Sequence, residues 1–133
     1  MSDLNVGLKL PGKTIAVTRE LLRRYAAASG DSNPIHLSDA AARAIGLDGV
    51  LAHGMWTMGA AVQVVLEWLD GDAARIKSYK VRFAAPLYVP ETGTTVEVAA
   101  TVSALTATTA TITLQVCCGD LQLLGGAKVE VSV

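Results

Sequence analysis

Asp31 and His36 are the two side chains of this sequence with the clearest potential for acid–base chemistry. They stand five positions apart in the polar segment 30–36. Pro34 fixes its own φ and pushes Asn33 towards an extended conformation, and the Asn33 side chain can bond to neighbouring backbone. A loop made rigid in this way can hold a carboxylate and an imidazole around one water molecule, as general acid–base catalysis requires.

A simpler interpretation of this pair stays open at this point. Aspartates in loops commonly cap turns, and a loop histidine can be an ordinary surface residue. The spacing of Asp31 and His36 alone does not decide between the two interpretations.

A second group of candidate residues, Ala52-His53-Gly54-Met55, lies where a long apolar helix is predicted to begin. Unpaired backbone N–H groups and the positive end of the helix dipole gather at such a position. Glycine there lets a ligand oxygen approach the backbone closely, so Gly54 could polarise a carbonyl group. Alternatively, Gly54 only relieves crowding where the helix meets a sheet.

Other kinds of site find little support in the sequence. A metal site is not expected, because the two histidines and the adjacent Cys117 and Cys118 show no ligand spacing such as HxH or HExxH. No glycine-rich nucleotide loop follows a predicted strand, and no G-x-S-x-G nucleophile elbow is present. Lys80 and Arg82 share one face of a predicted strand, where they could contact a ligand phosphate or simply face solvent.

The elements that would position these residues follow from caps and apolar patterns. A strand is predicted at Lys13–Thr18, and a helix capped by Thr18 is predicted to run to Gly30. A second helix is predicted at Asp39–Ile45, with Ser38 as its cap.

The third predicted helix runs from Gly54 or Met55 to about Leu69 and is apolar almost all round, which is typical of a helix buried on most sides. The segments after it are rich in Val, Thr and Ile and alternate in polarity, as half-buried antiparallel strands do. These strands are predicted at Arg75–Phe83, Thr94–Leu105, Thr109–Cys117 and Leu121–Val133. Gly125-Gly126 predicts a bulge or a close backbone approach in the last strand.

The predicted fold class is therefore α+β, with a curled antiparallel sheet wrapped around a central buried helix. Residues 1–133 are expected to form one domain.

The formal charge of −1 and the lack of a basic run argue against a nucleic-acid partner. The sequence begins without the features of a signal peptide, and the adjacent cysteines are expected to stay reduced, so a cytoplasmic protein without a membrane segment is predicted.

Two blocks of the sequence resemble the MaoC-like, or (R)-specific enoyl-thioester hydratase, family. Residues 25–36, Tyr-Ala-Ala-Ala-Ser-Gly-Asp-Ser-Asn-Pro-Ile-His, are similar to its hydratase motif, and residues 51–55, Leu-Ala-His-Gly-Met, match its second block. Residues 46–48, 52–59, 79–83 and 89–90 also look like the catalytic subunit of (3R)-hydroxyacyl-carrier-protein dehydratases.

The resemblance implies a hot-dog fold and a hydro-lyase that hydrates trans-2-enoyl thioesters, or dehydrates (3R)-hydroxyacyl thioesters, in fatty-acid metabolism. Asp31 and His36 would hold the water between them, with their division of acid and base roles undecided. The Gly54 N–H would bond to the thioester carbonyl. The supporting residues would be Ser29, Asn33 and His53.

No cofactor is implied beyond the CoA or phosphopantetheine that enters as part of the substrate. A homodimer, or a heterodimer with a related hot-dog subunit, is expected. The carrier stays open, because the loop after Phe83 departs from the family's usual Pro-Val and Gly-Asp pattern. The acyl chain length also stays open, because the central helix mixes Ala60 and Ala61 with larger residues, and the physiological direction is undecided.

Two alternative functions predict different residues. A non-catalytic acyl-binding partner subunit would be expected to lack Asp31 or His36, and both are present. A hot-dog thioesterase would be expected to carry a carboxylate on or near the central helix, where the first acidic residue is Glu67.

Overall fold

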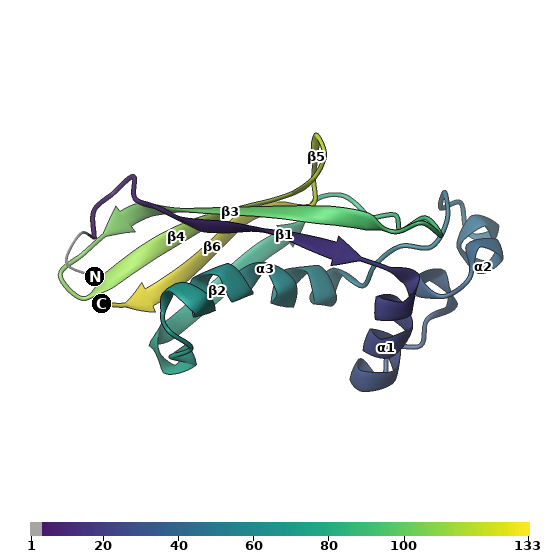
Figure 1. The fold of residues 1–133 in the computed structure, drawn as a ribbon, viewed down its shortest axis with the longest axis horizontal. Coiled ribbons are helices and arrows are strands. Elements are labelled where there is room, and N and C mark those ends of the chain that lie inside the picture. The colour runs from purple at the N-terminus through teal and green to yellow at the C-terminus, as the bar shows by residue number, and fades with distance from the viewer. Residues whose placement is uncertain (1–3) are drawn as a thin grey trace.

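In the computed structural model, which describes residues 4–133, an antiparallel sheet packs against one long helix, and two shorter helices lie beyond one end of the sheet (Figure 1). The elements in chain order are β1 (Lys9–Val17), α1 (Arg19–Ser29), the 3-10 helix η1 (Pro34–His36), α2 (Asp39–Ala44), α3 (Gly54–Trp68), the 3-10 helix η2 (Ala73–Arg75), β2 (Ile76–Phe83), β3 (Thr94–Leu105), β4 (Thr109–Cys118), β5 (Leu121–Gln122) and β6 (Leu124–Ser132).

The strands lie in the order β1-β3-β4-β6-β2, all neighbours are antiparallel, and the short β5 pairs with β4. Strands β1 and β2 are therefore the two edges of the sheet. The predicted α+β architecture, an antiparallel sheet around a central helix, is confirmed.

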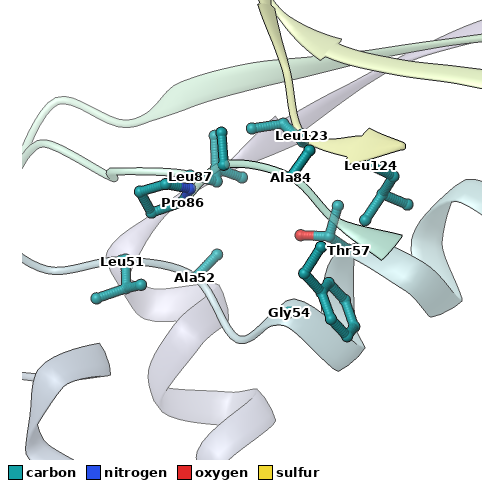
Figure 2. A pocket seen from close by; sticks show the side chains of 11 residues that line it. Leu51, Ala52, Gly54, Thr57, Ala84, Pro86, Leu87, Leu123 and Leu124 are labelled. Carbon is teal, nitrogen blue, oxygen red and sulfur yellow. The ribbon is translucent and has the colours of Figure 1, made fainter. Parts of the chain in front are cut away.

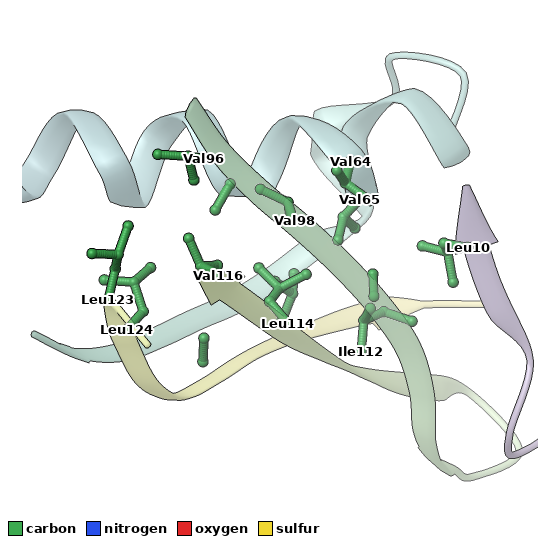
Figure 3. Close-up of a cluster of buried hydrophobic side chains, with 14 of the residues drawn as sticks. Leu10, Val64, Val65, Val96, Val98, Ile112, Leu114, Val116, Leu123 and Leu124 are labelled. Carbon is green, nitrogen blue, oxygen red and sulfur yellow. The ribbon is translucent and has the colours of Figure 1, made fainter. Parts of the chain in front are cut away.

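The hydrophobic core lies between α3 and the sheet face that it crosses (Figure 3). Strands β3 and β4 each bury every second residue against the helix, which is the period expected of a sheet with one covered face. The largest fully buried aliphatic side chains include Leu22, Val65, Val96, Ile112, Leu123 and Leu124. Burial of each such side chain contributes on the order of 1.5–3 kcal/mol, so this interface supplies most of the stability of the fold.

The outer side of α3 is less covered than its composition predicted. Met55, Gly59, Gln63 and Glu67 recur every four residues and form an exposed stripe along the helix. A helix that is apolar nearly all round is usually enclosed. A single sheet, however, can cover only one of its faces, and no other element within residues 4–133 covers this stripe.

The two short helices begin as predicted, and α2 ends at Ala44, one residue before the predicted Ile45, which is its C-cap. The Thr18 side chain accepts a hydrogen bond from the Leu21 N–H, and the Ser38 side chain accepts one from the Ala41 N–H. Helix α1 ends where Gly30 adopts a φ of 79°, a left-handed conformation that favours glycine. This turn directs the chain out of the helix and into the loop that carries Asp31.

Two predicted strands differ from those observed. Strand β1 begins at Lys9 instead of Lys13, because a register shift between Leu10 and Lys13 accommodates Pro11 and Gly12 in an edge strand. The predicted last strand is divided into β5 and β6, since the Leu123 N–H still bonds to β4 while its carbonyl turns towards the residues after β2. The predicted bulge at Gly125-Gly126 is confirmed by a register shift against β2.

A salt bridge joins the helical end of the molecule to the loop that leads into α3. The Arg19 guanidinium donates to both carboxylate oxygens of Asp39, at 3.0 and 2.9 Å, and its Nε donates to the Val89 carbonyl at 2.9 Å. Asp39 Oδ1 also accepts from the Val50 N–H at 2.9 Å. A Cβ at Gly49 would lie 2.9 Å from the same carboxylate oxygen, so any residue other than glycine would displace the Asp39 side chain.

No helix within residues 4–133 is long and apolar enough to cross a membrane. Residues 1–3, which belong to the predicted domain and to the segment inspected for a signal peptide, lie outside the described residues.

Asp39 gives a prediction about stability and pH. The hydrogen bond from Arg19, followed by the one from the Val50 N–H, lowers the pKa of Asp39 below its ordinary value of 3.8. A carboxyl with a lowered folded-state pKa adds stability above its unfolded-state pKa and loses it as the pH falls through the folded-state pKa. Asp39→Asn should therefore melt below the wild-type protein at pH 7, and the gap should close as the pH falls below 3.8. Thermal melts from pH 2 to pH 7 measure this; a gap that does not depend on pH would contradict it.

Candidate active site

The loop between α1 and η1 is braced by hydrogen bonds among its own residues. The Asp31 N–H donates to Ser29 Oγ, the Asn33 N–H donates to Asp31 Oδ1, and the Ile35 N–H donates to Asn33 Oδ1, each at 3.2 Å. These local turns leave the second carboxylate oxygen of Asp31 free, and the side chain is 52% exposed. The loop therefore presents a carboxylate in a fixed position at the surface.

His36 is buried at the end of η1, and its hydrogen bond fixes which nitrogen carries the proton. Its Nδ1 lies 2.7 Å from the Leu51 carbonyl oxygen. A carbonyl only accepts, so Nδ1 must donate, and neutral His36 then has its lone pair on Nε2. Nε2 lies 3.9 Å from Asp31 Oδ2. This distance is too long for a direct hydrogen bond, but one water molecule could bond to both atoms.

His53 contacts both members of this pair. Its ring is 1% exposed and stacks on the His36 ring, with centroids 3.8 Å apart and planes inclined by 23°. Its Nε2 lies 3.0 Å from the backbone carbonyl of Asp31, so this nitrogen donates. The Tyr25 ring packs edge-on against the His53 ring, with the two ring centroids 4.7 Å apart. One buried ring thus holds the loop at Asp31 and the imidazole of His36 together.

Gly54 is the first residue of α3 and keeps its backbone N–H unpaired. The first intrahelical bonds run from the Trp56 and Thr57 N–H groups to the His53 carbonyl, at 3.1 and 3.2 Å. Among the described residues, nothing accepts from the Gly54 N–H, which points outward at the positive end of the helix dipole. A Cβ at this position would lie 3.0 Å from the Phe83 ring. Glycine therefore allows both the close approach of Phe83 and access to the amide.

A cavity of about 250 Å³ lies against Gly54 (Figure 2). Its walls are formed by Leu51, Ala52, Gly54, Thr57, Phe83, Ala84, Ala85, Pro86, Leu87, Leu123 and Leu124. The cavity adjoins the acid–base pair, because Leu51 supplies the carbonyl that holds His36 and His53 directly precedes Gly54. Of the candidate residues, Gly54 lines the cavity, whereas Asp31, His36 and His53 do not line it and are joined to it through the backbone of Leu51 and the peptide before Gly54.

Of the residues that line this pocket, the sequence predicted only Gly54 as a site residue, and two of the others matter most for its chemistry and shape. Thr57 is the one lining residue whose side chain carries a polar group, and Phe83 closes the pocket against Gly54. Thr57 could have been noticed as a hydroxyl in an apolar helix, three residues after Gly54. No local signal indicates that Phe83, 29 positions further along, would meet Gly54.

Lys80 and Arg82 do not line the cavity beside Gly54. Tyr79 donates from its hydroxyl to the Met58 carbonyl of α3 at 2.7 Å, so the alternate residues Lys80 and Arg82 face away from the helix. The Arg82 guanidinium lies over Gly125 on that outer face. The structure does not bring either cation to the cavity, and their contact with a substrate phosphate stays a prediction.

Asp31, His36 and His53 also form the one group of potential metal ligands found within residues 4–133, with one ligand atom of each within 4.8 Å of the others. One nitrogen of each histidine already donates to a carbonyl, however. The rings are stacked nearly parallel, so their remaining lone pairs do not converge on one point. The arrangement fits acid–base chemistry better than metal binding.

Comparison with known proteins shows the family of this chain. The family model described as "MaoC like domain" matches residues 6–116. A "3-hydroxyacyl-thioester dehydratase X" of Mycobacterium tuberculosis is 45% identical over 82 residues, which are 62% of this chain and 28% of that protein.

Three solved structures show the same fold. A "MaoC-like dehydratase" superposes with a TM-score of 0.92 at 32% identity, over 98% of this chain and 41% of the other. The R-hydratase PhaJ1 from Pseudomonas aeruginosa has a TM-score of 0.80 at 25% identity, over 98% of this chain and 83% of the other. The ChsH1–ChsH2 complex from Mycobacterium tuberculosis has a TM-score of 0.85 at 24% identity, over 97% and 98%.

These likenesses identify the fold as the hot-dog fold. The chain spans less than half the length of both the tuberculosis dehydratase and the MaoC-like dehydratase structure.

The hydrogen bonds of the two histidines predict opposite neutral tautomers. Because Nδ1 of His36 and Nε2 of His53 both face carbonyl oxygens, neutral His36 should be protonated at Nδ1 and neutral His53 at Nε2. Imidazole ¹⁵N chemical shifts, measured at alkaline pH and assigned with His53→Gln, would show this directly. The same tautomer at both residues would contradict the geometry.

Proposed function

This chain belongs to the MaoC-like dehydratase family, and we propose that it catalyses the reversible, (R)-specific hydration of trans-2-enoyl thioesters to (3R)-hydroxyacyl thioesters. The observation that carries the proposal is the hydrogen bond from His36 Nδ1 to the Leu51 carbonyl, at 2.7 Å. It leaves the Nε2 lone pair facing the Asp31 carboxylate, and His53, which stacks on His36, directly precedes the free N–H of Gly54. Acid–base chemistry next to a carbonyl-binding group is what addition of water to a conjugated thioester needs.

In the hydration direction, the water held between His36 Nε2 and Asp31 Oδ2 gives up one proton and its oxygen bonds to C3. The electron pair of the C2=C3 bond moves towards the thioester carbonyl, and the negative charge on that oxygen is stabilised by the Gly54 N–H. C2 then takes up a proton. The proton that leaves the water is balanced by the proton that reaches C2, so His36 and Asp31 need only transfer it between the two places. Dehydration follows the same steps in reverse.

The other catalytic assignments rest on contacts that hold this pair in place. Ser29 and Asn33 brace the Asp31 loop, and His53 bonds to the Asp31 carbonyl while stacking on His36. We assign these three a positioning role. The substrate is a CoA or carrier-protein thioester, with the carrier entering as part of the substrate.

The thioesterase alternative is less well supported. The first acidic residue of α3, Glu67, is exposed and pairs with Lys13 at 2.6 Å. It lies 13 residues beyond Gly54, which corresponds to roughly 20 Å along a helix. A carboxylate at that distance cannot act on a carbonyl bound at Gly54.

We further propose that the chain works as a dimer, with itself or with a related hot-dog chain. Strand β2 has its outer edge unpaired among the described residues, and the stripe of α3 from Met55 to Glu67 is open. Unpaired strand edges, and exposed apolar side chains such as Met55, are commonly covered in assemblies. The printed title of the ChsH1–ChsH2 structure describes a complex of two chains. A cytoplasmic location remains a prediction from the sequence.

The proposed reaction is tested with crotonyl and longer trans-2-enoyl thioesters, by following the loss of absorbance of the conjugated thioester. Asp31→Asn and His36→Ala should each lower the rate about 10²- to 10⁴-fold, the usual contribution of an acid–base group, with an unchanged circular dichroism spectrum. Asp120→Asn, the same change in an exposed turn between β4 and β5, is the matched control and should keep the wild-type rate.

The assay is run with CoA and carrier-protein thioesters, and with and without a co-expressed related hot-dog chain. Wild-type rates in both variants would refute the roles of Asp31 and His36. A wild-type protein inactive under all of these conditions would refute the proposed function.

The proposed dimer is tested by light scattering on the purified chain and on the co-expressed pair. We expect a particle of two hot-dog chains in at least one of these samples, because pairing satisfies the open hydrogen-bonding groups of β2. A monomer in both samples would contradict the proposal.

A further inference from the structure

We propose that the Thr57 hydroxyl donates a second hydrogen bond to the carbonyl oxygen of the bound thioester, alongside the Gly54 N–H. This inference rests on the function proposed above, because the hydration reaction is what places negative charge on that oxygen.

Thr57 is the unusual side chain of the cavity. It is 4% exposed, and its hydroxyl has no hydrogen-bond partner among residues 4–133. Figure 2 shows its oxygen pointing into the cavity, away from the helix backbone. Among the described residues, the fully buried side-chain atom without a partner is His53 Nδ1, so the Thr57 oxygen is not fully enclosed although its side chain is buried. Threonine in a helix can usually bond to a backbone carbonyl of the preceding turn. A hydroxyl that faces an otherwise apolar pocket instead is available to a ligand.

The position of Thr57 on α3 directs this hydroxyl towards Gly54. The two residues are three positions apart, which places them on nearly the same side of the helix, and both line the cavity. Side chains on a helix lean towards its N-terminus, over the preceding turn. The Thr57 hydroxyl therefore leans towards the end of α3 where the Gly54 N–H is free.

The remaining walls of the cavity favour the same assignment. Leu87, Leu123 and Leu124 are almost fully buried and offer no polar side-chain atoms. In such surroundings a hydrogen bond to a developing negative charge is stronger than in water. A carbonyl oxygen has two lone pairs, so it can accept from a backbone N–H and from a hydroxyl at once. The two donors would form a hole shaped for the charged oxygen of the transition state.

The kinetic test uses two substitutions that separate the hydroxyl from the shape of the side chain. Thr57→Val keeps the size and branching and removes the donor, whereas Thr57→Ser keeps the donor. We expect Thr57→Val to lower kcat by about 10²-fold, the usual loss for one donor to an oxyanion, and to change KM far less. Thr57→Ser should retain most of the wild-type kcat. Thr95→Val, the same change at an exposed position of β3, is the matched control and should leave kcat unchanged.

The second test measures the contact itself without turnover. A butyryl thioester labelled with ¹³C at the carbonyl lacks the double bond and cannot be hydrated, so its carbonyl stretch can be recorded on the enzyme by infrared spectroscopy. Hydrogen bonding weakens the C=O bond and lowers this frequency. We expect the lowering to be smaller in Thr57→Val than in the wild-type protein and in Thr57→Ser.

The outcomes distinguish this inference from the proposed function. If the wild-type protein turns over enoyl thioesters and Thr57→Val keeps both its kcat and the lowered frequency, the Thr57 assignment is overturned while the function stands. A change in KM alone, with an unaltered frequency, would mean that the hydroxyl contacts another part of the substrate and would also overturn it. A wild-type protein that hydrates no thioester would contradict both the proposed function and the Thr57 assignment.

Discussion

The contact on which the site depends is the pair of hydrogen bonds between the segment at Leu51 and the loop before it. The Leu51 carbonyl accepts from His36 Nδ1, and the Leu51 N–H donates to the Ile35 carbonyl at 3.2 Å. The first bond sets the tautomer of the imidazole, and both hold the 30–36 loop against the start of α3. Without them, the lone pair of His36 would have no fixed direction relative to Asp31 or to the Gly54 amide, and the three groups could not act on one substrate.

Backbone hydrogen bonds also join the segment around Leu51 to the loop that follows β2. The Ala52 N–H donates to the Leu87 carbonyl, and the Val89 N–H donates to the Val50 carbonyl, each at 2.9 Å. The segment that carries Leu51 is therefore fastened between the acid–base loop and the loop after β2, and the Arg19–Asp39 salt bridge fastens it again at Val50. The cavity lies where these loops meet α3. Its position follows from the same hydrogen bonds that orient the proposed catalytic pair, Asp31 and His36.

Much of the fold could be predicted because its signals are local. Caps at Thr18 and Ser38 act over three residues, and the alternation in β3 and β4 records which side of each strand is covered. The predictions were wrong where a tertiary contact overrides the local pattern. β1 extends through Pro11-Gly12 because an edge strand tolerates a bulge, and the last strand divides at Leu123 because that residue bonds to two different neighbours.

For the site, the sequence by itself determined which groups are available: a carboxylate and an imidazole on a loop made rigid by Asn33-Pro34, and a glycine at the start of an apolar helix. Only the tertiary structure decided how they are placed. The protonated nitrogen of His36, the position of Phe83 against Gly54 and the direction of the Thr57 hydroxyl all depend on which surfaces meet. Spacing along the chain constrains neighbours a few residues apart, but distances between segments far apart in the sequence are set by how the sheet packs on α3.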